Sequence, residues 1–493
     1  MILKRFKSKR NFVYIRPHRG DDGDIDRPKT MTELPNLNES VDAFSAYYYE
    51  TNSQPGRFTA GNISDTGRTF LMTPYKAKNL KLTIPELICQ VEGGWHIYQC
   101  IQAPPQDLQK SEGLLQKPYE GVLGLLEKNY KRNEDGILEM INTMHQKKQK
   151  KVLAHLIKQY GSYLFANKSI MSISLPISVF EPRSHLERVA NSFTYAPHFL
   201  EKAGFSEDPL EQFKLTITHW IASLHTNLNP QKPFNPILGE TYQGLIDGCP
   251  VYVEHISKEP STCCYQMYGR TYRITGNCEF NITTGSNCVM YREDGYPKVY
   301  FVNTGVTVIA SLPLGTMQGI VVGKTTFNLS NKLFCIDPQN KFYAEINFNV
   351  GSAWTSKKRR PKDYISGTVW KVSDSFIDDL LIQMAETKRL DPNFKESEHA
   401  AIELASIEGS WLQYLDINKT RYWTLGKELP YVLCRFDNPL PSDSNYRLDI
   451  LHLKAGNEIK AQEAMNSIED KQRRDDKLRG KQVSPRKNQW KKT

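Results

Sequence analysis

Residues 232–242 of the chain read KPFNPILGETY, a short segment that combines a cation, an amide and an apolar side chain. Two prolines restrict the backbone that carries Lys232, because the proline ring fixes φ. Asn235 adds an amide between them, Leu238 adds an apolar contact, and Gly239 permits a tight turn. Charge, hydrogen bonding and apolar surface therefore meet in one rigid loop. Taken alone, such a loop is more often an ordinary Pro-Gly turn with a solvated lysine.

The composition is that of a globular protein with a β-rich core. Hydrophobic residues make up 39% and charged residues 24% of the 493 positions, which argues against disorder throughout. The length allows one large domain plus extensions. Aromatic residues at 11%, including 25 tyrosines, favour strands. The formal charge of +10 suits an acidic partner surface, either an anionic membrane or a nucleic acid.

The cysteines and the N-terminus indicate a reducing compartment. The nine cysteines include no C-x-x-C pair, so neither a zinc ribbon nor a disulfide framework is indicated. The first residues are charged without an apolar stretch behind them, unlike a secretory signal. We therefore expect a cytoplasmic protein with no metal site and no cofactor.

One uncharged segment, residues 299–323, has a length that could span a bilayer. Glycine, proline and asparagine interrupt it, however. The parts VYFVN, VTVIASL and GIVVG are predicted to be short strands joined by turns. A transmembrane helix is not expected.

The commoner catalytic and nucleotide-binding motifs are missing from the sequence. Residues 319–325, GIVVGKT, approach a phosphate loop, but that motif needs four residues between its glycines and this segment has three. Neither a G-x-S-x-G elbow nor an H-E-x-x-H pair occurs. His219 and His225, near Trp220, are interpreted as core or surface histidines and not as a catalytic pair. We therefore predict that the protein is not an enzyme.

The part of the chain before residue 146 is predicted to be accessory. Residues 1–75 are rich in Gly, Asp, Asn, Ser and Pro, which predicts a mostly flexible region. Residues 76–145 are predicted to hold short strands, between 80 and 102, and helices, of which two lie between 111 and 163. The apolar residues at helical spacing are Val122, Leu125, Leu126 and Tyr130 for the first helix, and Ile137, Met140, Ile141 and Met144 for the second.

A basic run, residues 147–151, leads directly into an amphipathic helix. Its apolar positions recur at three- and four-residue steps: Val152, Leu153, Leu156, Ile157, Tyr160, Tyr163 and Leu164. One interpretation is a core-facing helix with a solvated start, and the other is a mobile lid that also senses membrane.

The remainder of the chain changes from strands to helix. From residue 170 to about 435, short β-branched and aromatic runs alternate with turns, which is typical of an antiparallel barrel or sandwich. After Pro441, acids and bases recur at helical spacing. Residues 482–493 are basic and are predicted to be a flexible tail. The basic runs could contact nucleic acid, but no nucleic-acid-reading motif accompanies them, and anionic lipid offers the same attraction.

Three segments in order resemble one known family. They are LPISVFEPRSHLERVANSFTYAPHFLEKA at 175–203, NPQKPFNPILGETYQG at 229–244 and VYVEHIS at 251–257. Together they resemble the lipid-binding domain of the oxysterol-binding-protein-related proteins. The resemblance continues through GIVVGKTTFNLSNKLFCID, ETKRL at 386–390 and NYRLDILHLKAGN, and it covers residue 170 to about 481. The run KPFNPILGE is the most specific part of it.

The resemblance implies an α+β, β-dominated fold. We expect an incomplete antiparallel β-barrel around a hydrophobic tunnel, with an N-terminal lid at about 147–170 inside a domain at 146–481 and a C-terminal helical extension. The tunnel would hold one sterol or phospholipid. In the family, phosphatidylinositol 4-phosphate can occupy the same tunnel, its headgroup bound by the lysine and asparagine that match Lys232 and Asn235.

The sequence departs from the family at the headgroup site. Where the family has E-Q-V-S-H-H-P-P, this chain reads EHISKEPS, so Lys258 and Glu259 replace a histidine pair. Glu469 and Arg473 match the family's acid and base in the C-terminal helix, but Met465 replaces a lysine one turn earlier. Because Glu259 adds a negative charge and one cation is lost, we predict weakened phosphoinositide binding.

The functional prediction is a lipid-binding and lipid-transfer protein, cytoplasmic and peripheral to anionic membranes, with organelle contact sites as the expected place of action. The lipid ligand is left open between a sterol and a phospholipid, and no nucleic-acid partner is expected. The alternative is a lipid sensor or scaffold at membrane contacts that binds a lipid but transfers none. The same tunnel would serve both.

Overall fold

The computed structural model describes residues 61–62, 69–76, 83–91, 94–99, 126–160, 175–285, 287–349, 360–389, 401–436 and 438–483. For the strands before residue 100, and for residues 153–160 and 479–483, it describes the backbone alone. Among the described residues, no helix combines the length and the apolar character that crossing a bilayer requires.

A separate antiparallel sheet forms before residue 100. Its four strands are β1 (Gly61–Asn62), β2 (Thr69–Lys76), β3 (Thr83–Val91) and β4 (Gly94–Gln99), paired in that order. The strands expected between residues 80 and 102 are therefore confirmed. β1 and most of β2 lie within the region 1–75, to which the sequence pattern assigned no strand.

The rest of the strands build one large antiparallel sheet and a small parallel pair. The parallel pair is β7 (Phe180–Ser184) with β8 (Lys232–Phe234). The large sheet contains β5 (Tyr130–Arg132), β6 (Leu138–Met140), β9 (Thr241–Ile246), β10 (Cys249–Lys258), β11 (Ser261–Tyr268), β12 (Tyr272–Thr284), β13 (Cys288–Asp294), β14 (Lys298–Phe301), β15 (Thr307–Ala310), β16 (Leu314–Gln318), β17 (Thr326–Ser330), β18 (Lys332–Asp337), β19 (Phe342–Phe348), β20 (Tyr364–Lys371), β21 (Ile402–Ser410), β22 (Tyr414–Ile417), β23 (Thr420–Thr424) and β24 (Leu433–Arg435).

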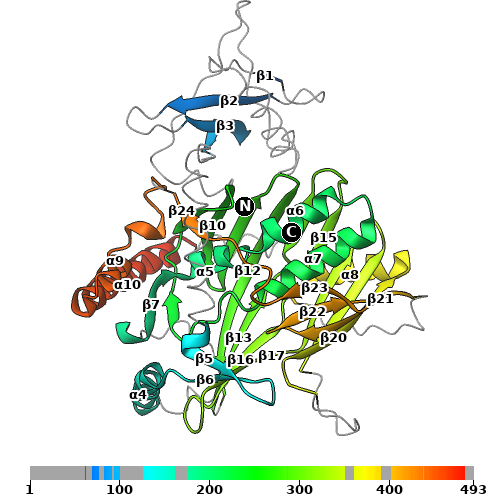
Figure 1. The fold of residues 1–493 in the computed structure, drawn as a ribbon. Helices are drawn as coiled ribbons and strands as arrows, with labels where there is room; N and C mark the ends of the chain where they lie inside the picture. Colours follow the sequence, from blue (N-terminus) through cyan, green and yellow to red (C-terminus); the bar gives the residue numbers. More distant parts are fainter. Residues whose placement is uncertain are drawn as a thin grey trace, which may run out of the picture.

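The large sheet divides into two branches at β12. The first half of this long strand pairs with β14 and its second half with β13. One branch continues through β13, β16, β17, β6 and β5, and the other through β14, β15, β18 and on to β23. On its other side β12 is followed by β11, β10, β9 and β24. The described pairings do not join these ends, so the incomplete antiparallel barrel is confirmed (Figure 1).

The apolar core fills the concave side of the sheet. Burial follows the alternation of strand side chains in β19, where every second side chain from Phe342 to Phe348 is buried, and Tyr343 on the other face is buried in a second cluster. The largest buried side chains include Trp411, Trp423 and Tyr272. Helices α5 (His185–Asn191), α6 (Ala196–Phe205) and α7 (Pro209–Ser223) pack their apolar faces into the same cluster. A hydrophobic tunnel within this core stays a prediction.

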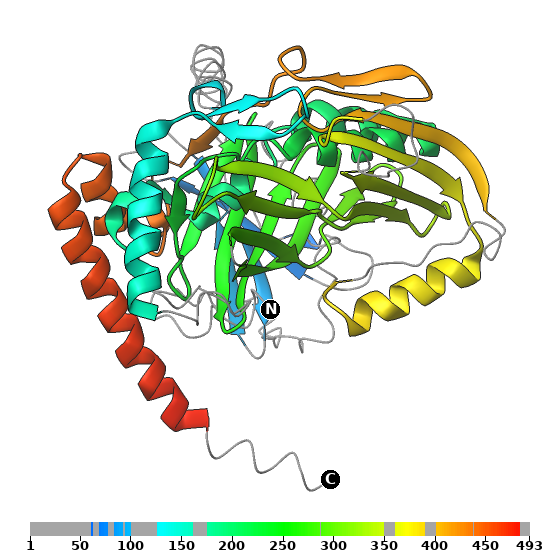
Figure 2. The ribbon, with the colours of Figure 1, turned by 90° about the horizontal axis from the view of Figure 1, so that it is seen from below.

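Four helices lie at the edges of the sheet. α4 (Thr143–Tyr160) runs beside α10 (Glu458–Val483), where Lys148 Nζ lies 3.8 Å from a Glu458 oxygen (Figure 2). The short α9 (Leu448–Lys454) precedes α10. α8 (Asp374–Glu386) covers the opposite flank. The helix predicted from residue 147 and the helices predicted after Pro441 are thus confirmed.

The helix predicted over residues 137–144 is wrong in its first half. Residues 130–140 form the hairpin β5–β6, which turns at Gly136 with φ +75°. The Met140 amide donates to Thr325 O at 2.8 Å, so pairing with a distant strand overrides the local helical spacing. The first predicted helix is described only at 126–129 before Tyr130 enters β5, and Val122 and Leu125 lie outside the described residues.

Residues 319–323, predicted as a strand, form a turn instead. The strands predicted just before them are confirmed as β14 and β15. Gly319 has φ +69°, and the Asn287 side-chain oxygen accepts hydrogen bonds from the Val321 and Val322 amides. Backbone groups that a strand would pair with a neighbour are therefore held by one asparagine side chain.

We predict that Gly319→Val destabilises the protein more than Gly305→Val. A Cβ at Gly319 would lie 1.9 Å from Lys324 O, whereas at Gly305, with φ +70°, it would meet nothing within 4 Å. Only the left-handed backbone then opposes the control substitution, at about 1–2 kcal/mol. Thermal unfolding of both variants checks this, and equal losses would show that the close approach to Lys324 does not matter.

Candidate functional site

The predicted loop places Lys232 on an aromatic floor. β8 runs parallel to β7, with Lys232 opposite Phe180, and the rings of Phe180 and Phe234 stack at 4.8 Å between centroids. Lys232 Nζ lies 5.1 Å above the Phe180 ring. It also donates to Pro233 O at 3.3 Å and to the side-chain oxygen of Asn235. The cation and the amide predicted to act together are in direct contact.

The surroundings of Lys232 disfavour the charged form of its side chain. Burial, with a smaller contribution from the nearby Arg188 and Arg447, lowers the pKa of its ammonium to about 7, while Glu469 acts in the opposite direction. Its direct partners are a carbonyl and an amide, which carry no net charge. The neutral Lys232 amine therefore takes up a proton readily when an anion approaches.

A buried ion-pair network behind the loop holds its backbone. Arg447 Nη1 lies 2.9 Å from a Glu240 oxygen and donates to Asn235 O at 2.7 Å, and Arg447 Nε donates to Asp449 at 3.0 Å. The side chains of Arg447, Glu240 and Asp449 are 8%, 2% and 0% exposed. Ser184 also donates to Glu240. The network fixes the position of Asn235 and thereby that of Lys232.

A second buried carboxylate, Glu181, holds two further arginines beside the loop. Its oxygens accept from Arg183 Nη2 at 3.3 Å, from Asn229 at 2.5 Å and from Arg188 Nε. Arg188 Nη2 also donates to Gln231 O at 2.5 Å. These cations are therefore already paired within the protein.

Helix α10 brings an acid and an apolar side chain to the site. Met465 is 3% exposed and belongs to an apolar cluster with Phe180, Phe234 and Ile450. Glu469 lies one turn further along, close enough for its charge to favour the ammonium of Lys232. Leu238 is half-buried in the loop itself. The position at which the family has a lysine is thus part of the apolar floor.

The other predicted headgroup residues lie further from Lys232 along α10. Lys258 and Glu259 are exposed at the end of β10, and Lys258 Nζ pairs with Asp476 on α10. Asp476 is seven residues beyond Glu469, or about 10 Å along a helix. Arg473 is exposed and pairs with Glu469 at 3.6 Å and with Asp470 at 2.6 Å. The structure brings Lys232 and Asn235 into contact and places Glu469 within electrostatic reach of Lys232. Lys258 pairs with Asp476 instead, and Arg473 with Glu469 and Asp470.

The predicted lid is described only at its beginning. Val152 is half-buried and packs against the apolar cluster that contains Met465. For Leu153, Leu156, Ile157 and Tyr160 the structure describes the backbone in α4, and Tyr163 and Leu164 lie outside the described residues. A lid over the site stays a prediction.

The sequence pattern missed the residues that surround the loop. Arg188, Glu181 and Arg447 were part of the segments that resemble the family, but no role was inferred for them. The signal was present, because the stretch EPRSHLER places four charges between apolar strand and helix residues. Charged side chains in such a context are seldom buried without partners.

His219 and His225 are core residues. Burial lowers the pKa of His219 to about 3 and that of His225 to about 4. His225 Nε2 lies 3.0 Å from Tyr195 Oη. Over the described ranges, no three His, Cys, Asp or Glu side chains are grouped to hold a metal ion.

A family model described as oxysterol-binding protein matches residues 164–493. The chain belongs to the oxysterol-binding protein family. It is 29% identical over 356 residues to oxysterol-binding protein 9 of Dictyostelium discoideum, covering 70% of this chain and 80% of that protein. It is 25% identical to human oxysterol-binding protein-related protein 5, covering 44% of this chain and a quarter (25%) of that protein.

Solved structures of oxysterol-binding proteins share the fold. The ORD of Osh3 from Saccharomyces cerevisiae, solved in complex with PI(4)P, gives a TM-score of 0.51 at 19% identity, covering 72% of this chain and 89% of that one. The Osh1 ORD domain in complex with cholesterol gives 0.52 at 17% identity, covering 76% and 88%. The resemblance seen in the sequence is confirmed, and the chain carries the lipid-binding domain of this family.

Proposed function

We propose that this protein carries one sterol or phospholipid at a time between membranes and binds phosphoinositides weakly. The observation that carries the proposal is the Lys232 loop, in which one half-buried ammonium stands on an apolar floor of Phe180, Phe234 and Met465. A polar group of an amphiphile would meet Lys232 and Asn235, while its apolar part would be buried. Apolar burial contributes about 0.8 kcal/mol per methylene, so a protein interior competes with a bilayer.

The relatives support a lipid ligand of this size. The Osh3 domain was solved with PI(4)P, and the Osh1 domain with ergosterol and with cholesterol. Those ligands are amphiphiles, each with a polar end and a large apolar part. The mechanism proposed for this chain is binding and release, without bond chemistry.

The charges around Lys232 support weak binding of a phosphate monoester. Arg188 and Arg447 are already paired with buried carboxylates, and Lys258 is paired with Asp476. Met465 supplies no charge, and Glu469, which pairs with Arg473, places a carboxylate within electrostatic reach of the ammonium. A multiply charged headgroup would gain one partly protonated lysine and would face this carboxylate. A sterol hydroxyl needs only a hydrogen-bonding partner.

Membrane contact is proposed at the beginning of α4. Lys147, Lys148 and Lys151 are exposed there. Lys148 lies close to Glu458, the first residue of α10. Each basic residue near an anionic surface contributes about 1 kcal/mol.

A vesicle-to-vesicle assay with a fluorescent sterol tests the proposal. We expect the full chain to accelerate sterol movement between phosphatidylcholine vesicles and expect phosphatidylinositol 4-phosphate in the acceptor vesicles to change the rate little. Sterol binding without acceleration would identify a sensor and not a carrier. Tight phosphatidylinositol 4-phosphate binding that Lys232→Ala abolishes and Lys427→Ala preserves would contradict the weak headgroup site.

Introducing two histidines at the end of β10 should strengthen phosphoinositide binding. In the double variant Lys258→His and Glu259→His, the negative charge of Glu259 at the end of β10 is removed and the contact of Lys258 with Asp476 is released. We expect phosphatidylinositol 4-phosphate affinity to rise about tenfold with sterol affinity unchanged. Competition binding measures both. An equal change in sterol affinity would show that these residues act on the fold.

A further inference from the structure

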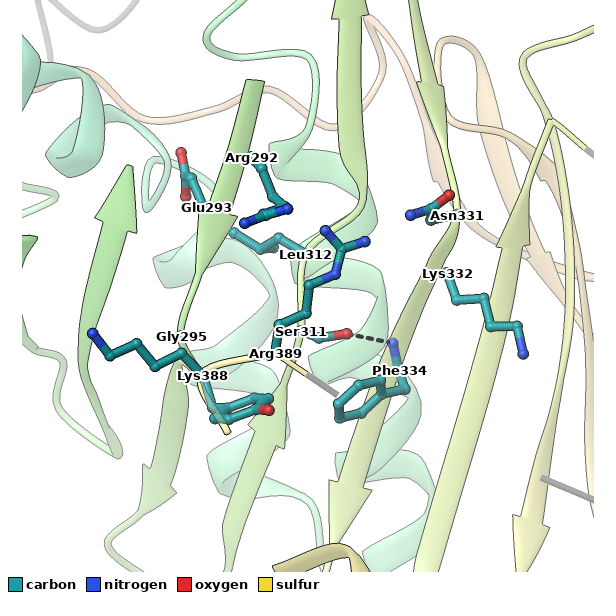
Figure 3. A pocket seen from close by; sticks show the side chains of 11 residues that line it. Arg292, Glu293, Gly295, Ser311, Leu312, Asn331, Lys332, Phe334, Lys388 and Arg389 are labelled. Atoms are coloured by element: carbon teal, nitrogen blue, oxygen red, sulfur yellow. Dashed lines mark hydrogen bonds between the residues drawn. The ribbon is translucent and has the colours of Figure 1, made fainter. Parts of the chain in front are cut away.

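A pocket lies in the fork where the two branches of the large sheet separate, and we call it the fork pocket. The space between its lining residues is about 420 Å³, a figure that includes the open solvent at its mouth. β13 contributes from one branch, β18 and the β15–β16 connection from the other, and the residues after α8 close one side (Figure 3). Its polar lining residues include Arg292, Ser311, Asn331, Lys332, Lys388 and Arg389.

The sheet topology creates this space. β12 pairs with β14 and then with β13, so β13 and β14 diverge after the turn at Gly295. Gly295 has φ +138°, and a Cβ there would lie 2.2 Å from Asn277 O, which keeps the turn against β12. In the second branch, two hydrogen bonds join Ser311 to Phe334. The Ser311 amide donates to Phe334 O at 3.0 Å, and the Phe334 amide donates to Ser311 Oγ at 3.1 Å.

The fork pocket carries an excess of positive charge. Arg292 pairs with Asp294 at 2.8 Å, Lys332 with Glu345 at 3.1 Å and Lys388 with Glu279. Arg389 adds a further cation, for which no ion pair or hydrogen bond is found within the described part of the chain. Its guanidinium and that of Arg292 reach into the same space beside Leu312 (Figure 3). Two like charges in one space are stabilised by an anion between them.

The acid that lines the fork pocket does not neutralise it. Glu293 alternates with Arg292 along β13, so its side chain points to the opposite face of the strand. There its carboxyl accepts a hydrogen bond from Tyr291 Oη. Burial raises the pKa of Glu293, which further disfavours its charged form.

We propose that the fork pocket binds a phosphate group through Arg389 and through Arg292 Nη1, because the pair of Arg292 with Asp294 uses only its Nε and Nη2. Guanidinium groups pair with phosphate oxygens through parallel N–H donors, and one phosphate accepts from two arginines. Ser311 Oγ accepts from the Phe334 amide and keeps its own hydrogen to donate. The Asn331 side chain lies at the same rim. The phosphate belongs either to a free anion or to a lipid headgroup.

The fork pocket shares no residue with the Lys232 loop. The experiment therefore uses the full chain with Lys232→Ala, so that the loop does not contribute to phosphate binding. Inorganic phosphate is titrated by calorimetry. In parallel, co-sedimentation is measured with phosphatidylcholine vesicles that contain phosphatidic acid, a phosphate monoester, or the same fraction of phosphatidylserine.

We expect saturable binding of phosphate, of phosphatidic acid vesicles, or of both, weakened about tenfold by Arg292→Gln with Arg389→Gln. Arg421→Gln, a matched change at an exposed arginine elsewhere, should leave binding unchanged. Binding of phosphate alone identifies a free-anion site, and preference for phosphatidic acid vesicles identifies a headgroup site. The proposal is overturned by absent saturable binding, by full binding in the double variant, or by an equal loss with Arg421→Gln.

Discussion

Replacing Arg447 with leucine is expected to lower the free energy of unfolding by about 3–5 kcal/mol. The substitution leaves the carboxylates of Glu240 and Asp449, which are 2% and 0% exposed, without their cation. It also removes the 2.7 Å hydrogen bond to Asn235 O, which positions the ligand loop. Because uncompensated buried charge is costly, the effect should exceed that of any exposed ion pair in the chain.

Denaturant unfolding of Arg447→Leu and Arg421→Leu measures this effect against a matched control. Arg421 pairs with Asp416 but is 45% exposed, so its loss should cost about 1 kcal/mol or less. Adding Glu240→Gln and Asp449→Asn to Arg447→Leu should restore part of the stability, since the buried negative charges are removed. If both single variants lose the same amount, the buried network does not stabilise the fold as proposed.

The second large effect is the pH dependence of anionic ligand binding. The free protein holds Lys232 with a pKa of about 7, and a bound phosphate would raise this pKa because the opposite charge favours the ammonium. Binding therefore takes up a proton, and affinity should fall by up to about tenfold per pH unit as the pH rises above 7. Sterol affinity should stay constant with pH, because a sterol carries no charge that could raise the pKa of Lys232.

The same lysine should make the stability of the fold depend on pH. In the unfolded chain its pKa returns towards the ordinary value of 10.5, so between about pH 7 and 10.5 the unfolded state binds more protons than the folded state. Stability contributed by this residue therefore rises with pH across that window and is lowest below pH 7. Other groups add their own dependence, so the comparison is with a variant.

Lys232→Met isolates both effects. Ligand titrations and thermal unfolding are measured at several pH values between 6 and about 10. Anionic-ligand affinity and stability should both change with pH in the parent protein and should change less in the variant. Lys427→Ala, an exposed lysine elsewhere, serves as the control and should keep the parent slopes. Identical slopes in the parent and in Lys232→Met would assign the pH dependence to other groups.

The sequence by itself determined the features that depend on near neighbours. Lys232 and Asn235 are three residues apart and each is followed by a proline, and their contact follows from that spacing. Alternating and helical patterns located β14, β15, α4 and α10, because each pattern reports which side chains share one face. The ordered motifs indicated the family, and with it the incomplete barrel.

Only the tertiary structure decided which distant residues meet around that loop. Arg447 and Glu240 are far apart in the chain, yet they form one buried pair, and the cluster around Met465 joins α10 to β7 and β8. Residues 138–140 became a strand in spite of their helical spacing, because Met140 pairs with Thr325. Local sequence patterns do not report contacts between residues that are far apart in the chain. Their formation depends on the net free energy of the whole fold, in which burial and pairing of remote groups outweigh local preference.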